Sequence, residues 1–174
     1  MLPKKIVMAV YVLKTIQKIP SDIETVWKFF SRPDNLQEIT PKDMNFVITT
    51  PYLSKEAYAG EIITYKVTPL PGIRLRWVTE ITQVKAKEYF VDEQRFGPYA
   101  LWHHEHHFKI IEGGVEMTDM VYYKLPLGFI GDLVHPLLVQ KKLNDIFTYR
   151  FEKVEAIFGK WKDGALNQIQ FSKT

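Results

Sequence analysis

Cysteine is absent from the 174 residues, which excludes disulfides and thiolate metal ligands within this chain. Long hydrophobic runs are also missing, because no stretch approaches the roughly eighteen apolar residues that a membrane-spanning helix needs. The net charge is only +3, and the Lys and Arg residues are scattered along the chain without forming a basic stripe. We therefore expect a soluble, cytoplasmic protein that does not bind nucleic acid.

The motifs of covalent catalysis and of phosphate binding are missing as well. The sequence has no Gly-x-Ser-x-Gly elbow, no serine placed beside a histidine in a familiar pattern, and no glycine-rich phosphate loop. We accordingly assign no catalytic residue and expect no cofactor. Enzymatic activity stays open as an alternative, and a protein without enzymatic activity is the favoured interpretation.

Apolar side chains are plentiful, at 46% of the sequence, and 14% of the residues are aromatic. That composition can build one domain with a sizeable core, and no repeat or linker divides the chain. We predict a single domain over residues 1–158 and a loose extension over residues 159–174, where the apolar period is lost. The apolar run after Lys4 and Lys5 is interpreted as a lead-in to the first strand, because Lys14 stands where a signal peptide would have small residues.

The longest helical pattern covers Gly131 to Phe158, and one of its faces is apolar over about four turns. That face comprises Leu143, Ile146, Phe147, Val154, Ile157 and Phe158. Arg150 falls in the middle of it, where a charge needs a partner or must reach solvent. The candidate partners are Asp119 and either Asp92 or Glu93, and the alternative is the carboxylate or carbonyl of a ligand.

Two short helices are expected after the first strand. Ser21 begins a capping pattern, Ser-Asp-Ile-Glu, in which its hydroxyl caps the first helix and Glu24 reaches back to the backbone. Pro33 interrupts that helix, and a second short turn covers Leu36–Ile39. From Met44 onward apolar residues alternate with polar ones, which predicts half-buried antiparallel strands, about seven in all.

The last two strands form a predicted hairpin around Gly113-Gly114. A two-residue turn there pairs Glu112 with Val115 and fixes the register of both strands outward from it. In that register the apolar residues of the two strands share one face, and His104 and His106 point to the same side.

The run His103-His104-Glu105-His106-His107 is the sharpest local signal. Alternation along a strand places His104 and His106 inward and the other three outward. Neither face supplies three or four supported ligands of the kind that zinc usually requires, so we predict no metal site. The inward pair is interpreted as wall residues that bond to Tyr123, Asp119 or a ligand oxygen.

The order of the elements is one strand, two short helices, six strands and a long C-terminal helix. This order predicts an α+β fold in which a curved antiparallel sheet of about seven strands wraps around the long helix. The helix is then segregated to one face of the sheet.

Several stretches carry a resemblance that extends from about Tyr11 to Phe158. They are Val26-Trp27-Lys28-Phe29-Phe30-Ser31-Arg32-Pro33, Ile39-Thr40-Pro41, Phe90-Val91-Asp92-Glu93-Gln94, the segment from Gly97 to Phe108, Thr118-Asp119, Leu125-Pro126-Leu127-Gly128 and Ile146-Phe147-Thr148-Tyr149-Arg150. With these stretches the chain resembles the helix-grip proteins of the SRPBCC superfamily, which includes START domains, birch-pollen-allergen-like proteins and polyketide cyclases. It is most similar to a bacterial ligand-binding group of that superfamily, found alone or appended to epimerase-like reductases.

The resemblance implies a hydrophobic cavity between the sheet and the C-terminal helix, holding a lipid, an isoprenoid or a polyketide-like molecule. The predicted cavity residues are Tyr65, Trp77, Asp92, Gln94, Trp102, His104, His106, Phe108, Asp119, Tyr123, Phe147 and Arg150. The predicted cavity mouth comprises Leu127, Phe129 and Ile130.

The expected function is that of a carrier or sensor for such a ligand, acting as a monomer or a weak homodimer. A cyclase-like or dehydratase-like enzyme is one alternative, because fold-level likeness leaves the reaction open. A membrane-docking lipid carrier, which would use the apolar mouth residues, is the other alternative, and membrane contact is not favoured.

Overall fold

An eight-stranded antiparallel sheet and one long helix dominate the structure, a computed structural model that describes residues 10–51, 55–70, 72–126, 138–162 and 167–174. The order of the strands across the sheet is β2-β3-β4-β5-β6-β7-β1-β8. The strands are β1 (Tyr11–Ile19), β2 (Val47–Ile48), β3 (Ile62–Leu70), β4 (Ile73–Lys85), β5 (Tyr89–Phe96), β6 (Leu101–Ile111), β7 (Gly114–Lys124) and β8 (Gln168–Lys173).

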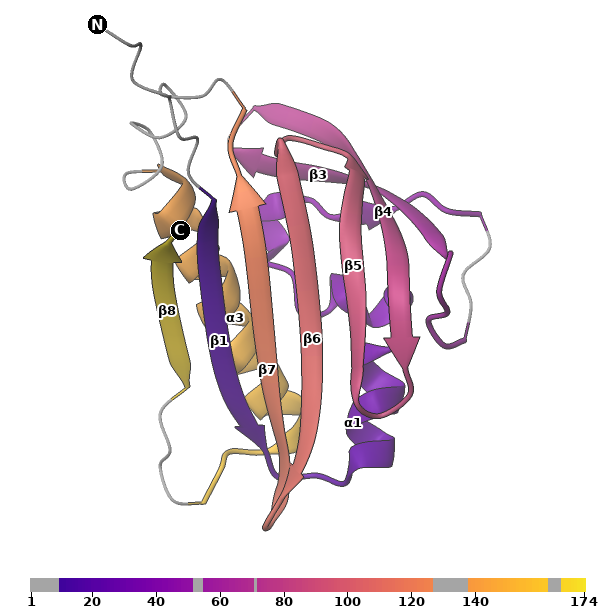
Figure 1. The fold of residues 1–174 in the computed structure, drawn as a ribbon, viewed down its shortest axis with the longest axis vertical. Helices are drawn as coiled ribbons and strands as arrows, with labels where there is room; N and C mark the ends of the chain where they lie inside the picture. The colour runs from indigo at the N-terminus through magenta and orange to yellow at the C-terminus, as the bar shows by residue number, and fades with distance from the viewer. Residues whose placement is uncertain (1–9, 52–54, 71, 127–137, 163–166) are drawn as a thin grey trace, which may run out of the picture.

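The helices α1 (Ile23–Phe30) and α3 (Gln140–Phe158) lie on the same face of the sheet (Figure 1). Helix α3 contacts β1 and β8, and α1 contacts β6 and β7. This arrangement confirms the predicted α+β fold, a curved sheet around a C-terminal helix, with one strand more than expected.

Alternation of period two builds the inner face of the sheet. Along β7 every second residue from Val115 to Tyr123 is buried, and the residues between them are half-buried. On β6 the buried positions are His104, His106 and Phe108. Because alternate side chains of a strand point to opposite faces, one face is turned toward the helices. The predicted inward placement of the two histidines agrees with this burial.

The N-cap of α1 is Asp22, so the prediction that Ser21 caps this helix is wrong. The Asp22 carboxylate accepts a hydrogen bond of 2.9 Å from the backbone N–H of Thr25 and another of 2.7 Å from the Thr25 hydroxyl. An aspartate also places a negative charge at the helix start, which the helix dipole favours. Two 3₁₀ turns follow, η1 (Pro33–Gln37) and η2 (Lys42–Met44).

Helix α3 buries Leu143, Phe147, Arg150, Phe151 and Val154. At 100° per residue these positions span about −20° to +80° around Leu143, so Ile157, at about −40°, falls outside the buried face. Ile157 is indeed exposed, which corrects the predicted apolar face. Residues 131–137 of the predicted helix lie outside the described part of the chain. Within the described ranges, no helix is both long enough and apolar enough to cross a membrane.

The β6–β7 hairpin turns one residue earlier than predicted, at Glu112 and Gly113, so that Ile111 pairs with Gly114. Gly113 has a φ of 83°, which favours glycine. A Cβ on Gly114 would lie 2.1 Å from the carbonyl oxygen of Ile19. The second glycine therefore allows β1 to approach closely and does not belong to the turn.

The register of the hairpin shifts by two residues as a result. Val115 pairs with Ile110 where the sequence predicted Glu112, and His106 stands opposite Asp119. A shift of two residues preserves the alternation of faces, so the inward side chains remain inward. The corrected register brings a carboxylate directly beside a histidine.

The prediction of a loose C-terminal extension is wrong for residues 168–173. This segment is strand β8, which pairs with β1 from Tyr11↔Lys173 to Ile16↔Gln168. Ile169 and Phe171 pack against a cluster of buried residues that includes Leu13 and Leu143. Their alternation with Gln168 and Gln170 is a short period-two signal that the sequence carries.

Candidate functional site

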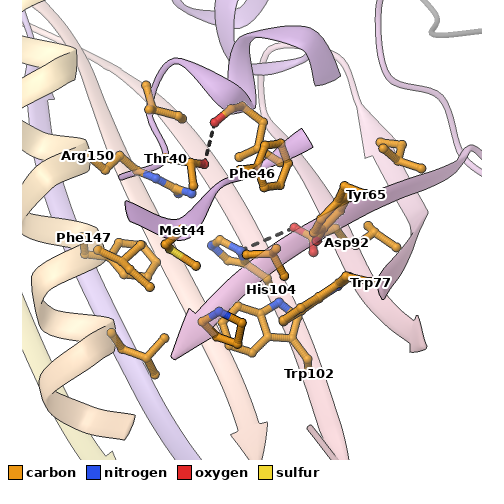
Figure 2. Close-up of a pocket in the computed structure, with 18 of the residues that line it drawn as sticks. Thr40, Met44, Phe46, Tyr65, Trp77, Asp92, Trp102, His104, Phe147 and Arg150 are labelled. Carbon is orange, nitrogen blue, oxygen red and sulfur yellow. Dashed lines mark hydrogen bonds and ion pairs between the residues drawn. The ribbon is translucent and has the colours of Figure 1, made fainter. Parts of the chain in front are cut away.

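A cavity of about 670 Å³ lies between α3 and the inner face of the sheet. The predicted aromatic residues on its wall are Tyr65, Trp77, Trp102 and Phe147, and the predicted polar ones are Asp92, His104, His106 and Arg150. They come from four strands, β3 to β6, and from α3. Figure 2 shows Phe147 and Arg150 from the helix and Tyr65, Trp77, Asp92, Trp102 and His104 from the sheet converging on one space.

Aromatic contacts hold the sheet side of the cavity wall. Trp77 stacks on Tyr65, with ring centroids 5.9 Å apart, and meets Trp102 edge-on at 5.4 Å. Phe46 lies 4.7 Å from the Tyr65 ring. Aromatic pairs at these distances stabilise one another beyond their burial, so the wall is held in place by its own contacts.

Four of the predicted cavity residues lie elsewhere. The side-chain amide of Gln94 bonds to the backbone of Tyr99, at 2.7 Å to its oxygen and 3.2 Å from its nitrogen. Phe108 packs edge-on against Trp27 at 5.5 Å, and Tyr123 stacks on Tyr11 at 5.6 Å. Asp119, the fourth, contacts the two cavity histidines without lining the cavity itself.

Other lining residues were not in the predicted set. They include Thr40, Met44, Phe46, Thr79, Leu143 and Ile146. Phe46, Leu143 and Ile146 carried a periodic signal in the sequence, whereas Thr40 and Met44 belong to the irregular region around η2. Irregular backbone has no period, so side-chain direction there cannot be inferred from spacing.

The mouth residues predicted from the sequence, Leu127, Phe129 and Ile130, lie outside the described residues. Leu125, Pro126 and Leu138, which flank that interval in the chain, line the cavity.

Two imidazole rings and two carboxylates form a compact group on the cavity wall. The ring centroids of His104 and His106 are 3.8 Å apart, with an angle of 38° between the planes. His104 has Nε2 at 3.0 Å from Asp119 Oδ1 and Nδ1 at 3.4 Å from Asp92 Oδ2. His106 has Nε2 at 2.8 Å from Asp92 Oδ2 and Nδ1 at 2.9 Å from Asp119 Oδ1. Nε2 of each ring therefore bonds to a carboxylate, whereas Nδ1 of His106 lies near Asp119 without a hydrogen bond.

Asp119 is the deepest member of this group, with 3% of its surface exposed. The Thr15 hydroxyl on β1 donates a hydrogen bond to its Oδ2 at 3.0 Å. Its Oδ1 lies 3.5 Å from Nη1 of Arg150, which comes from α3. One carboxylate thus joins β1, β6, β7 and the helix that covers the cavity.

The buried charges favour one another's ionised forms. Burial alone would raise the pKa of Asp119, but contacts with His104 and His106 and the charge of Arg150 hold it well below its usual range. The pKa of Asp92 is also lowered, because its interactions with His104, His106 and Arg150 outweigh desolvation. Both carboxylates are therefore ionised at neutral pH.

The two histidines differ from each other. Desolvation and the neighbouring His106 lower the pKa of His104. Desolvation acts on His106 too, but its contacts with Asp119 and Asp92 outweigh it and raise its pKa. Two adjacent imidazolium ions would repel each other, so His106 takes the proton in preference to His104.

Arg150 and Trp77 carry buried hydrogen-bond donors in the wall of the cavity. Arg150 is 8% exposed, and its guanidinium lies 4.8 Å from the centre of the Phe147 ring. Among the residues that the structure describes, neither Nε nor Nη1 of Arg150 has a hydrogen-bond acceptor, and nor does Nε1 of Trp77. Buried donors of this kind normally have a partner. Arg150 Nη1 therefore has the predicted ionic partner, Asp119, at 3.5 Å without a hydrogen bond, and Nε has no acceptor among the described residues.

The group formed by Asp92, His104 and His106 could also be considered for a metal, because its ligand atoms lie within 4.8 Å of one another. The geometry fits poorly, since the two rings lie only 3.8 Å apart and Nε2 of each ring already bonds to a carboxylate. To bind one metal ion, both imidazole rings would have to direct a nitrogen lone pair at the same point. The guanidinium of Arg150 beside Asp119 adds a repulsive charge.

We expect EDTA to leave the melting temperature of the protein unchanged, because the carboxylates and Arg150 already balance the buried charges without a metal. The measurement is a thermal melt of the purified protein before and after dialysis against EDTA, with a third sample supplemented with zinc. A drop of several degrees that zinc reverses would contradict this expectation.

Comparison with known proteins identifies the fold. No protein-family model matches this sequence, and no curated protein matches it. A protein of Arthrobacter aurescens, solved by NMR, is similar with a TM-score of 0.64 at 12% identity, over 97% of this chain and 98% of that one. The crystal structure of Ara h 8.0201 is similar with a TM-score of 0.57 at 14% identity, over 84% of this chain and 99% of that one.

A nucleoside-diphosphate sugar epimerase from Corynebacterium glutamicum is similar as well, with a TM-score of 0.58 at 23% identity. The match covers 81% of this chain and 28% of the epimerase chain. At such identities a likeness shows the fold alone. The chain has the helix-grip fold. The solved structures support the resemblance of its sequence to the SRPBCC superfamily at the level of the fold alone.

Proposed function

We propose that this protein binds an apolar small molecule in the cavity between α3 and the sheet, as a carrier or sensor. The single observation that carries the proposal is the cavity of about 670 Å³, walled mainly by aromatic and aliphatic side chains. Small-molecule sites are typically clefts of about 300–1,000 Å³ with apolar walls and a few convergent polar groups. Asp92, His104 and Arg150 are polar residues of this lining.

The aromatic wall favours a ligand with flat or branched hydrocarbon groups, such as an isoprenoid, a polyketide-like molecule or a lipid. Trp77, Trp102 and Tyr65 present ring faces and edges on one side. Phe147 and Ile146 of α3 stand on the other side. Dispersion contacts with such walls do not depend on one functional group, so the class of ligand is broader than any single compound.

A cyclase-like or dehydratase-like enzyme is the second candidate, and the imidazole–carboxylate group on the cavity wall favours it. General acid–base catalysis needs a titratable group within reach of the substrate. Nε2 of each ring bonds to a carboxylate, and Nδ1 of His106 has no hydrogen-bond partner among the described residues. We rank the enzyme second, because these residues match no catalytic motif in the sequence.

A fluorescent apolar probe such as phenyl naphthylamine should bind with a Kd in the micromolar range or better, because the aromatic walls bury its rings. Val67→Phe should weaken this binding by about tenfold or more, since Val67 lines the cavity and a larger side chain occupies part of it. The matched control is Val47→Phe on the neighbouring strand β2, where the side chain is exposed. Fluorescence titration gives the affinity for the probe of the wild-type protein and of both variants.

Equal affinity in the two variants would place the probe elsewhere, and a probe that stays dark with the folded wild-type protein would refute the cavity as a binding site. Native mass spectrometry of protein extracted from its own host identifies the ligand class directly, because a co-purifying molecule appears as added mass. Recovery of a chemically altered ligand after incubation would favour the enzyme. Co-sedimentation with liposomes would favour the membrane-docking carrier.

A further inference from the structure

Asp92 brings an unused carboxylate oxygen to the surface of the cavity. The residue lines the cavity, and 16% of its side chain is exposed. Its Oδ2 accepts a hydrogen bond of 2.8 Å from Nε2 of His106. Its Oδ1 accepts none from the described residues, and it is not one of the buried atoms that lack a partner. Oδ1 therefore keeps accessible surface, which faces the cavity because the side chain points inward.

His104 adds a second acceptor beside that carboxylate. Its Nε2 forms a hydrogen bond of 3.0 Å with Asp119 Oδ1. Because an ionised carboxylate only accepts, Nε2 carries the ring hydrogen. Desolvation and the neighbouring His106 lower the pKa of His104, so the ring is neutral at neutral pH and Nδ1 keeps its lone pair. Nδ1 has no hydrogen bond within the described residues and, like Asp92 Oδ1, is not one of the buried unpartnered atoms.

The two acceptors lie next to each other without a hydrogen atom between them. His104 Nδ1 is 3.4 Å from Asp92 Oδ2, and Figure 2 shows both residues on the sheet side of the cavity. Neither atom has a hydrogen to offer the other, so this part of the wall lacks a donor. A hydrogen bond to an ionised acceptor is stronger than one between neutral groups, so a ligand that supplies the donor gains affinity.

Two hydroxyl groups belong to the same part of the wall. The Tyr65 hydroxyl on β3 lies 3.1 Å from Thr79 Oγ1 on β4, and both residues line the cavity. Burial and the nearby charge of Asp92 raise the pKa of Tyr65, so its hydroxyl stays protonated. The bond between the two hydroxyls uses one of their two hydrogens. The other hydrogen can be donated to a ligand oxygen.

A hydroxyl group fits these neighbours better than other polar groups do. An ether or ketone has no hydrogen to donate to Asp92 or His104, and a carboxylate would place a second negative charge beside Asp92. An ammonium ion could donate, but it would lose its hydration in a cavity whose wall already contains Arg150. Resting on the proposed binding function, we propose that the Asp92 side of the cavity binds the hydroxyl group of an apolar alcohol or phenol.

The test compares three compounds of matched size as competitors of the bound fluorescent probe: octan-1-ol, heptyl methyl ether and octylamine. The ether is an isomer of the alcohol that accepts hydrogen bonds and cannot donate one. At neutral pH the alcohol should bind about tenfold more tightly than the ether, because only the alcohol donates to the carboxylate. Octylamine, which is a cation at this pH, should bind about tenfold more weakly than the alcohol. Displacement titrations give all three affinities on the wild-type protein.

Asp92→Leu tests the acceptor itself. This variant should prefer the alcohol over the ether by no more than about twofold, while its affinity for the ether stays within about twofold of the wild-type value. The matched control is Glu93→Leu on the same strand, because Glu93 lies outside the cavity lining and contacts Arg95 and His103. That control should keep the full preference for the alcohol.

Equal affinity for the alcohol and the ether, or tighter binding of octylamine than of the alcohol, would overturn the proposal while leaving apolar binding intact. The same holds if Asp92→Leu keeps the preference, if Glu93→Leu loses it, or if none of the three compounds displaces a bound probe. Failure of the probe and of all three compounds to bind would instead refute the proposed function. Thermal melts show whether both variants fold. If Asp92→Leu does not fold, the order of the three affinities on the wild-type protein decides the question.

Discussion

Asp119→Asn should lower the free energy of unfolding by about 3–5 kcal/mol, the cost expected when one partner of a buried ionic group is removed. The carboxylate contacts two histidines and Arg150 and accepts a hydrogen bond from Thr15. Asparagine keeps the shape but loses the charge, so Arg150 and the two histidines are left with one carboxylate. Denaturant titration of wild type and variant at neutral pH measures the difference.

A double-mutant cycle with Arg150→Met separates the ion pair from the rest of the group. Arg150→Met alone should cost less than Asp119→Asn, because Asp119 keeps its contacts with His104, His106 and Thr15. The double variant should regain part of the stability lost in Asp119→Asn, because it no longer contains a buried guanidinium without a counter-charge. If the two effects simply add, then Asp119 and Arg150 do not stabilise each other.

The control for this cycle is an exposed ion pair on the same helix. Lys141 Nζ lies 2.9 Å from Asp145, one helical turn away, and both side chains are exposed. Asp145→Asn should cost less than about 1 kcal/mol, because solvent screens such a pair. A loss of less than about 1 kcal/mol for Asp119→Asn as well would show that burial adds nothing to the ionic contacts of Asp119.

The second large effect is a fall in stability at acid pH. The pKa values of Asp92 and Asp119 are lower in the folded protein than their ordinary values. Their contribution is therefore fully present above the unfolded pKa of about 4 and is lost as the pH falls toward the folded values. We expect the free energy of unfolding to decrease by several kcal/mol between about pH 5 and pH 2.

The histidines act in opposite directions near pH 6.5. The raised pKa of His106 gives stability that is present below about pH 6.5 and lost as the pH rises through the folded value. The lowered pKa of His104 gives stability that is present above about pH 6.5 and lost as the pH falls toward its folded value. Because the two contributions oppose each other, we expect little change of stability around neutrality.

Denaturant titrations from about pH 2 to pH 8 measure this profile. Asp119→Asn should flatten the acid limb, because the variant has lost a carboxylate whose pKa is held well below its ordinary value, whereas Asp145→Asn should keep the wild-type slope. A variant curve that runs parallel to wild type through the acid limb would mean that Asp119 binds its proton with ordinary affinity.

Much of the inner face of the sheet was predictable because alternation survives errors of register. The predicted hairpin was shifted by two residues, and His104 and His106 still pointed inward. The residues of β7 that pair with these histidines were not predictable, because the pairing depended on which glycine formed the turn. The close approach of Ile19 to Gly114, which sets the turn, is a tertiary contact that no local pattern records.

The β5 strand shows where alternation stops being informative. The sequence left open whether Asp92 or Glu93 points inward. The pairing of β4 with β5 contains two register irregularities, one between Val78 and Thr79 and one between Ile81 and Gln83. Each inserted residue reverses the face to which the later residues of the strand point, so parity counted along the chain is lost there. Asp92 is the residue that lines the cavity, and Glu93 pairs with Arg95 and His103 on the other face.

Arg150 was conspicuous because helical spacing placed a charge in an apolar stripe, and its candidate partner Asp119 lies beside it. The lack of an acceptor for Nε and Nη1 depends on the positions of several strands at once. Spacing along one element identifies which residue is misplaced in a core, and only the assembled cavity shows which of its atoms are unused.

Strand β8 has a consequence for self-association. Exposed strand edges offer unpaired backbone N–H and C=O groups that can pair with another chain. With β8 in place, β1 is an inner strand, and the sheet ends on a six-residue strand with Gln and Lys side chains at one side and on the two-residue β2 at the other. A chain shortened before Gln168 would expose the nine-residue edge of β1 and would form intermolecular sheets more readily, even though no cavity residue had changed.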